Sequence, residues 1–262
     1  MRLFLCIVSM ILAAQTGWAQ SIRTTYVSLG SSNAILMEPV NPGPNSRIAL
    51  VYTYPRTNLS LSTPPSNNFN HASGPQMASR GYRELLLNQY TTGIGYEAYL
   101  PAISQAIKYL RALPGVEKVL LLSHSAGGPL VAFYQNVAEN GPRACQGPEK
   151  IYPCRGELAS LQKADGIVLL DSHLGEGFRT LTYVDPAVSD EGHPLQRNAA
   201  LDMFDTANGY NRTGKAATYN KDFLKEFFSA QAARNEKMIA AAVARLSAIE
   251  KGHSKYKDDE PF

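Results

Sequence analysis

Ser125 is the residue of this chain whose surroundings are most suited to chemistry, at the centre of Ser123-His124-Ser125-Ala126-Gly127. A serine hydroxyl is a weak nucleophile, so acyl transfer needs it to protrude toward a base and beside backbone N–H groups that bind an oxyanion. A sharp strand-to-helix turn gives both. The positions two before and two after the serine crowd each other there, and the usual pattern is G-x-S-x-G. Ser123 departs from it with a small residue, and Gly127 matches.

Two other interpretations of this segment stay open. Turns rich in serine and glycine follow buried strands in many α/β proteins without any catalytic role. His124 is adjacent to Ser125, and neighbouring side chains in a strand point to opposite sides, so turn packing fits this histidine better than the role of a base. The pattern still favours Ser125 as a nucleophile, because strand, turn and helix fall where the motif requires.

Continuous apolar runs alternate with amphipathic helical patterns on both sides of Ser125. We expect strands at 24–29, 34–39, 48–54, 84–88, 116–124 and 166–171, and helices at 74–80, 100–110 and 220–250. The first two strands form a hairpin, and the later ones read as buried parallel strands. The sequence therefore predicts an α/β fold: a mostly parallel sheet flanked by helices, with a long C-terminal helix.

The end of the chain gives weaker signals. A brief strand is expected at 179–184, followed by polar loops. The long helix carries one apolar stripe, formed by Leu224, Phe228, Ala232, Ile239, Val243, Leu246 and Ile249. If this stripe had no sheet to cover, self-association of the helix would be a further possibility.

Composition narrows the class of protein. The chain has 262 residues, 44% of them hydrophobic and 18% charged, with a net charge of +3 and no basic cluster beside aromatic residues, so nucleic acid is not an expected partner. Residues 1–19 have the basic start, short apolar core and small-x-small end of a cleaved signal peptide. Residues 20–262 are expected to form a single secreted or periplasmic domain without a membrane anchor.

Two cysteines follow the expected signal peptide, Cys145 and Cys154. An even number of cysteines in an oxidising compartment favours a disulfide between them. Free thiols or part of a metal site are the alternatives, although no ligand-like spacing accompanies the pair. No metal and no organic cofactor are expected.

The turn at Ser125, the hairpin followed by parallel strands, and the segment Met77-Ala-Ser-Arg-Gly-Tyr-Arg-Glu-Leu-Leu-Leu87 together resemble the α/β-hydrolase family over roughly residues 24–175. The resemblance implies that Ser125 is the nucleophile and that the N–H of Ala126 is one oxyanion donor. A backbone N–H near Arg56 would be the other donor, although Tyr54-Pro55-Arg56 replaces the glycine-rich turn common there.

The same resemblance implies an acid and then a histidine, each after a later strand. Asp171 is the last residue of the expected strand 166–171, and an acid at this place is an alternative used in some members of the family, so it is our candidate acid, with a cap of a helix or loop as the alternative. His193 is the candidate base, because its polar loop could fold over the strand edge, while an exposed loop histidine is the alternative. His173 shares the loop of Asp171, and His253 lies in the tail. No histidine follows a recognisable last strand, so we expect a hydrolase-like fold that is incomplete at its C-terminal side.

These observations lead to two functional hypotheses. The first is an exported serine hydrolase that acts on a small ester or related acyl substrate through an acyl-enzyme on Ser125. The second is a truncated or non-catalytic domain of the same fold that binds a ligand or partner.

Overall fold

The computed structural model describes residues 21–30, 32–55, 69–88, 95–147, 150, 154 and 156–253. The chain forms two compact units: unit 1 comprises Met1–Pro142 and Gly156–Leu170, and unit 2 comprises Arg143–Arg155 and Asp171–Phe262. The expected signal peptide at 1–19 lies outside the described residues. A single domain over 20–262 stays a prediction, because the compactness of two units does not show whether each of them folds by itself.

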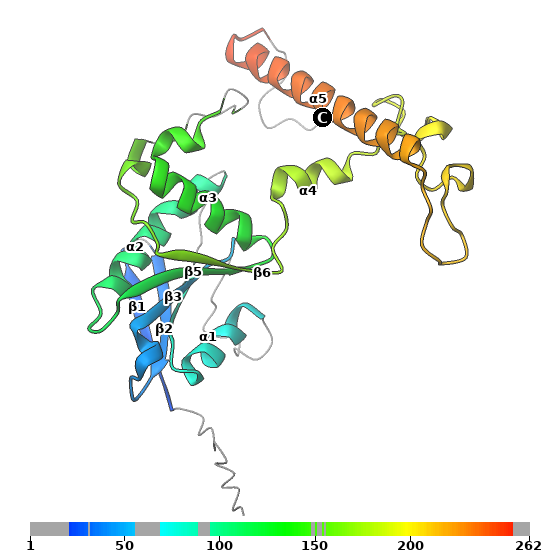
Figure 1. Cartoon of the computed structure of the whole chain (residues 1–262). Coiled ribbons are helices and arrows are strands. Elements are labelled where there is room, and N and C mark those ends of the chain that lie inside the picture. The colour runs from blue at the N-terminus through cyan, green and yellow to red at the C-terminus, as the bar shows by residue number, and fades with distance from the viewer. Residues whose placement is uncertain are drawn as a thin grey trace, which may run out of the picture. The chain divides into compact units, whose positions relative to one another are not determined.

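Unit 1 is built on a six-stranded sheet in the order β1-β2-β4-β3-β5-β6 (Figure 1). Its strands are β1 (Ile22–Leu29), β2 (Ser32–Pro39), β3 (Ile48–Tyr52), β4 (Arg83–Asn88), β5 (Lys118–His124) and β6 (Gly166–Leu170). Strands β4, β3, β5 and β6 run parallel to one another, and β2 pairs antiparallel with both β4 and β1. The mostly parallel sheet predicted from the sequence is confirmed.

The helices of unit 1 cover both faces of this sheet. They are α1 (Phe69–Ser79), α2 (Leu100–Arg111) and α3 (Gly127–Asn140), with short 3-10 turns η1 (Pro44–Arg47), η3 (Tyr96–Tyr99) and η5 (Gly156–Ser160). Helix α1 lies on one face, against β2 and β4, and α2 and α3 lie on the other (Figure 1). The apolar residues that recur at helical spacing in the predicted helix 100–110 are all buried, namely Leu100, Ile103, Ile107 and Leu110. Their helical spacing therefore located a core face correctly.

Unit 2 contains η4 (Pro142–Cys145, shared with the end of unit 1), α4 (Glu176–Tyr183), η6 (Ala199–Leu201), η7 (Thr206–Asn208) and α5 (Lys221–Glu250). The brief strand expected at 179–184 is wrong, because residues 179–183 belong to α4 and Val184 follows its end. Arg179 binds the carboxylate of Glu176 one turn earlier, at 2.6 Å, an i,i+3 pair that stabilises a helix. Such a pair favours a helix, whereas the threonines and the tyrosine of this segment favour a strand.

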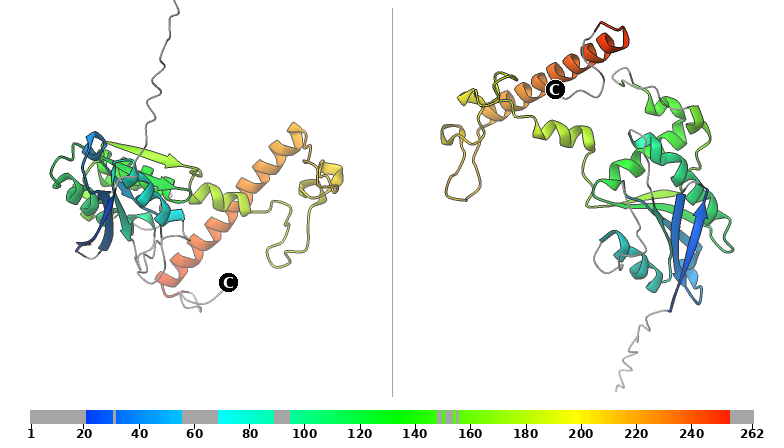
Figure 2. Two further views of the ribbon diagram at one scale, coloured as in Figure 1. Left: turned by 90° about the horizontal axis from the view of Figure 1, so that it is seen from below. Right: turned by 180° about the vertical axis from the view of Figure 1, so that it is seen from behind.

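Helix α5 is one uninterrupted helix, as the sequence predicts (Figure 2), and the side chain of Asn220 caps its first turn. The predicted apolar stripe is wrong in register, since the buried residues are Phe223, Phe227 and Gln231. Two apolar stripes start side by side in α5, and the buried one continues to Gln231, whose amide donates to Val184 O at 2.8 Å. Among the described residues, neither α5 nor any other helix has the length and apolar character needed to cross a bilayer.

A buried carboxylate lies under helix α1. The Glu84 side chain is fully buried on β4, and Ser73 of α1 donates to its Oε1 at 2.6 Å. Its Oε2 has no hydrogen-bond partner in the described part of the chain. Burial raises the pKa of Glu84 from its ordinary value of 4.5 to about 7. The pKa of Tyr52 is raised mainly by its own burial and, to a smaller extent, by the nearby charge of Glu84. The sheet thus contains an acid that is protonated below neutral pH.

Glu84→Gln is expected to remove most of the pH dependence of stability between about pH 5 and about pH 8. The folded-state pKa exceeds the unfolded one, so the native protein binds more protons in this window and its stability falls as pH rises. The effect is roughly 3 kcal/mol in the free energy of unfolding, and urea unfolding of both proteins at the two pH values measures it. Glu117→Gln is the control, because Glu117 is half-exposed and pairs with Arg47 at the surface. Equal pH dependence in wild type and Glu84→Gln would contradict the assignment.

Candidate active site

The turn that holds Ser125 joins the end of β5 to the start of α3. Strand β5 ends at His124 and α3 begins at Gly127, so Ser125 and Ala126 alone make the connection. Ser125 has φ 51°, and among the described residues only Asp171 is another non-glycine residue with positive φ. This left-handed conformation is unfavourable for a residue with a Cβ and is typical of strained functional turns. The predicted arrangement of strand, turn and helix is therefore present.

Two backbone hydrogen bonds hold the turn in this conformation. The N–H of Ser125 donates to Leu170 O at the end of the neighbouring strand β6, at 3.0 Å. Its carbonyl accepts from the N–H of Gly128 at 3.1 Å. Ser125 is itself partly exposed. Both backbone polar groups of Ser125 are thus hydrogen-bonded, and its side-chain hydroxyl is the group that remains available for chemistry.

The crowding expected across the turn is also present. A Cβ atom added at Gly127 would overlap Ser123 Oγ and lie 2.9 Å from Thr53 O. Both Ser123 and Gly127 are buried. Only glycine fits at position 127, whereas position 123 has room for a serine whose hydroxyl donates to the carbonyl of Thr53. The departure from glycine at Ser123 is therefore accommodated by a specific hydrogen bond.

The start of α3 is suited to an anion. The first N–H groups of a helix have no partners inside the helix and carry partial positive charge. Ala126 is the N-cap residue of α3, no side chain caps this end, and no acidic residue lies in the first turn. The N–H of Ala126 thus has the surroundings expected of an oxyanion donor. The second expected donor, near Arg56, lies outside the described residues.

The candidate acid and base belong to unit 2. Asp171 directly follows Leu170 and has φ 46°. His193 is mostly exposed, and its Nδ1 lies 2.9 Å from Asp190 Oδ2. The hydrogen bond from His193 is the main cause that lowers the pKa of the Asp190 carboxyl below its ordinary value. The structure describes Ser125 and these residues in separate units, so the roles of Asp171 and His193 stay predictions.

The structure also places three other histidines, His173, His253 and His124. In unit 2, Nδ1 of His173 accepts from the N–H of Gly175 at 3.0 Å, and its Nε2 lies 3.5 Å from a carboxylate oxygen of Glu176. His253 follows the end of α5, and its N–H donates to Ala248 O. His124 is the last residue of β5. The carboxylate contact of His193, at 2.9 Å, is within hydrogen-bond distance and is of the kind that orients a base, whereas the oxygen of Glu176 is farther from His173.

Two contacts of the candidate residues, one in each unit, were not anticipated from the sequence. The acceptor Thr53 lies 70 positions before Ser123, and no local pattern relates them. Asp190 had a detectable signal: the segment Asp190-Glu-Gly-His193 forms a turn in which the Asp190 carboxylate accepts from the N–H of Gly192 at 2.9 Å. Aspartate followed by glycine two positions later is typical of such turns.

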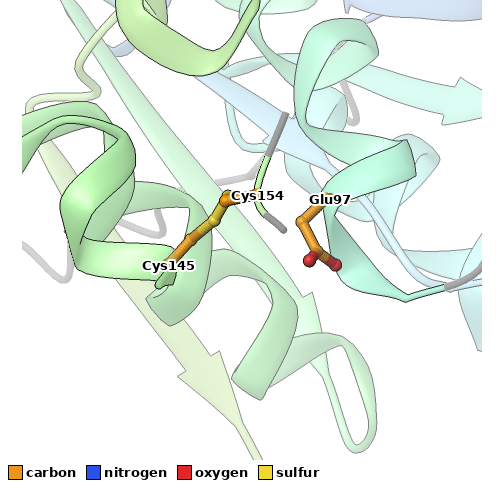
Figure 3. A group of neighbouring side chains, drawn as sticks. All are labelled: Glu97, Cys145 and Cys154. Carbon is orange, nitrogen blue, oxygen red and sulfur yellow. A yellow bond between two sulfur atoms is a disulfide. The ribbon is translucent and has the colours of Figure 1, made fainter. Parts of the chain in front are cut away.

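Cys145 and Cys154 form a disulfide, and Figure 3 shows the bond between their sulfur atoms. Their Cα atoms are 6.1 Å apart, inside the usual range. The side-chain amide oxygen of Gln146 also accepts from the N–H of Cys154 at 2.8 Å. The predicted pairing is present in the structure and closes a short loop.

Comparisons with known proteins give likenesses in structure only. No protein-family model matches the chain, and no curated protein does. The structure is similar to brefeldin A esterase, a bacterial homologue of human hormone-sensitive lipase, with 14% identity and TM-score 0.38 over 74% of this chain and 49% of that one. It is similar to the siderophore hydrolase EstB from Aspergillus fumigatus, with 14% identity and TM-score 0.37 over 57% of this chain and 42% of that one.

An esterase/lipase from an uncultured bacterium is a third similar structure, with 15% identity and TM-score 0.40 over 63% of this chain and 51% of that one. The chain thus spans about half the length of these structures or less. At such TM-scores these similarities do not indicate an activity. The proposal for the function is therefore based on the residues of the chain itself.

Proposed function

We propose that this chain is a serine hydrolase that cleaves a small ester or related acyl compound through a covalent acyl-enzyme on Ser125. The observation that carries the proposal is the conformation of Ser125, held at φ 51° between β5 and α3 by backbone hydrogen bonds to Leu170 and Gly128. Strain at a single polar residue next to an uncapped helix start is a feature of nucleophile turns.

The proposed reaction has two steps. Ser125 Oγ attacks the carbonyl carbon, its proton passes to the base, and the N–H of Ala126 binds the oxyanion of the tetrahedral intermediate. The intermediate expels the alcohol, which takes the proton from the base, and leaves an acyl group on Oγ. Water then attacks this ester, returns a proton to Oγ through the base, and releases the carboxylic acid.

His193 is our proposed base, and the atom for this role is Nε2, since Nδ1 lies against Asp190. A carboxylate at one imidazole nitrogen fixes the tautomer and leaves the other nitrogen to accept a proton. Asp171 is the acid proposed from the resemblance. Substitution by asparagine compares the two acids, Asp190 and Asp171. The variant that loses more ester hydrolysis identifies the carboxylate that orients the base.

Covalent labelling with a fluorophosphonate probe tests the nucleophile. We expect one label for each folded chain, on the tryptic peptide that contains Ser125, and slow hydrolysis of short p-nitrophenyl esters by the same protein. Labelling should stop after prior treatment with an unlabelled phosphonate. A folded protein that takes up no probe and hydrolyses no ester would contradict the proposal and favour a ligand-binding role.

A further inference from the structure

Ser123 occupies a position that ties the nucleophile turn to another strand. The regular pairing of β3 with β5 ends at Tyr52 and Leu122. Beyond it, the N–H of Thr53 donates to Leu122 O at 3.2 Å, and the carbonyl of Thr53 accepts from Ser123 Oγ. A side-chain hydroxyl therefore closes the end of this ladder, one residue after the last strand pair.

The first turn of α3 packs on this hydrogen bond. An added Cβ at Gly127 would meet both Ser123 Oγ and Thr53 O, so the backbone of Gly127 lies directly against the bonded pair. Ser123 and Thr53 are both fully buried, and no water reaches them to replace the bond. The hydrogen bond thus sets the distance between the end of β3 and the residues that follow Ser125.

We infer that Ser123 is a positioning residue: its hydroxyl holds the start of α3 against the end of β3, and so fixes the Ala126 N–H relative to Ser125 Oγ. A glycine at position 123 would have neither the hydroxyl nor the Cβ that fills this space. The inference rests on the proposed function, because it assigns Ser123 an effect on the reaction at Ser125.

The effect should appear in the transition state and not in substrate binding. The oxyanion forms only after Ser125 attacks, so a displaced Ala126 N–H weakens an interaction that the bound substrate does not yet make. Loss of the Ser123 hydroxyl should therefore lower kcat and leave KM nearly unchanged. Binding of an alkyl boronic acid, which forms a tetrahedral adduct with a serine nucleophile, should weaken in parallel with kcat.

The matched control is Ser46. Its hydroxyl is also buried and donates to a backbone carbonyl, that of Gly43, at 2.5 Å, and it lies in η1, before β3 begins. Ser46→Ala removes the same kind of bond away from the nucleophile turn. Any loss of stability that follows from one missing buried hydroxyl should be similar in Ser46→Ala and Ser123→Ala, whereas the kinetic effect should differ.

The experiment measures kcat, KM and boronic acid affinity for wild type, Ser123→Ala, Ser123→Gly and Ser46→Ala, each normalised to folded chains that react with the fluorophosphonate. We expect kcat to fall about tenfold in both Ser123 variants, with KM within about twofold of wild type, and no change in Ser46→Ala. Ser123→Gly provides the measurement if Ser123→Ala does not fold.

Two negative results can be told apart. An active wild type whose Ser123 variants keep kcat, or change only KM, would overturn the positioning role while leaving the proposed function intact. A wild type that neither hydrolyses esters nor reacts with the probe would overturn both.

Discussion

Ser125→Ala is expected to lower ester hydrolysis by roughly 10⁴-fold or more and to abolish fluorophosphonate labelling. The variant keeps the turn and the Ala126 N–H, but it has no oxygen to form the acyl bond. Steady-state hydrolysis of a p-nitrophenyl ester, normalised to folded protein, measures the change. Ser46→Ala is again the control, because it removes a serine hydroxyl that has no part in the proposed reaction.

Ser125→Gly separates the cost of strain from the loss of chemistry. Glycine adopts positive φ freely, so this variant should be more stable than Ser125→Ala by about 1 kcal/mol while being equally inactive. Urea unfolding of the two variants gives the difference. Hydrolysis that persists in both variants would mean that another residue is the nucleophile, and equal stability would mean that the turn is not strained in solution.

Gly127→Ala is expected to be the most damaging substitution of a small residue in unit 1. The added Cβ would overlap Ser123 Oγ and press on Thr53 O, and both of these residues are fully buried. We expect a loss of about 3 kcal/mol in the free energy of unfolding, because overpacking a dense core costs about that much. Activity should fall at least about 100-fold, because α3 must shift away from Ser125.

Two further variants make the Gly127 result specific. Ser123→Gly combined with Gly127→Ala removes the first overlap but leaves the approach to Thr53 O at 2.9 Å, so stability should return only in part. Gly43→Ala is the control, since a Cβ there meets nothing within 4 Å and φ is −118°. A Gly127→Ala protein with the stability and activity of wild type would contradict the packing described for the turn.

The core of unit 1 was predictable because its signals are local. Apolar residues at helical spacing located α2, and continuous apolar runs located β3, β4 and β6 within a few residues. The start of α1 was placed five residues late, at 74 instead of Phe69, because a segment with Ser73, Gly74 and Pro75 has weak helical propensity. Here contact with β2 and β4 outweighs local preference.

Unit 2 was less predictable, for a physical reason seen in α5. Its first turns have apolar residues at both 223/227 and 224/228, so periodicity alone gives two acceptable faces. The buried face also makes polar contacts with a distant segment: Gln231 donates to Val184 O, and Arg234 donates to the carbonyl of Asp185. Such contacts join residues nearly 50 positions apart, and no window of sequence contains both partners.

The sequence by itself determined the candidate nucleophile, since a buried apolar strand, a small-residue turn and a helix start are all encoded within the residues around Ser125. It also indicated the cysteine pair and the class of fold. Only the tertiary structure decided that Ser123 donates to Thr53 and that Glu84 is buried under α1. The physical reason is that backbone conformation follows from neighbouring residues, whereas hydrogen bonds and burial between strands depend on the order of strands in the sheet.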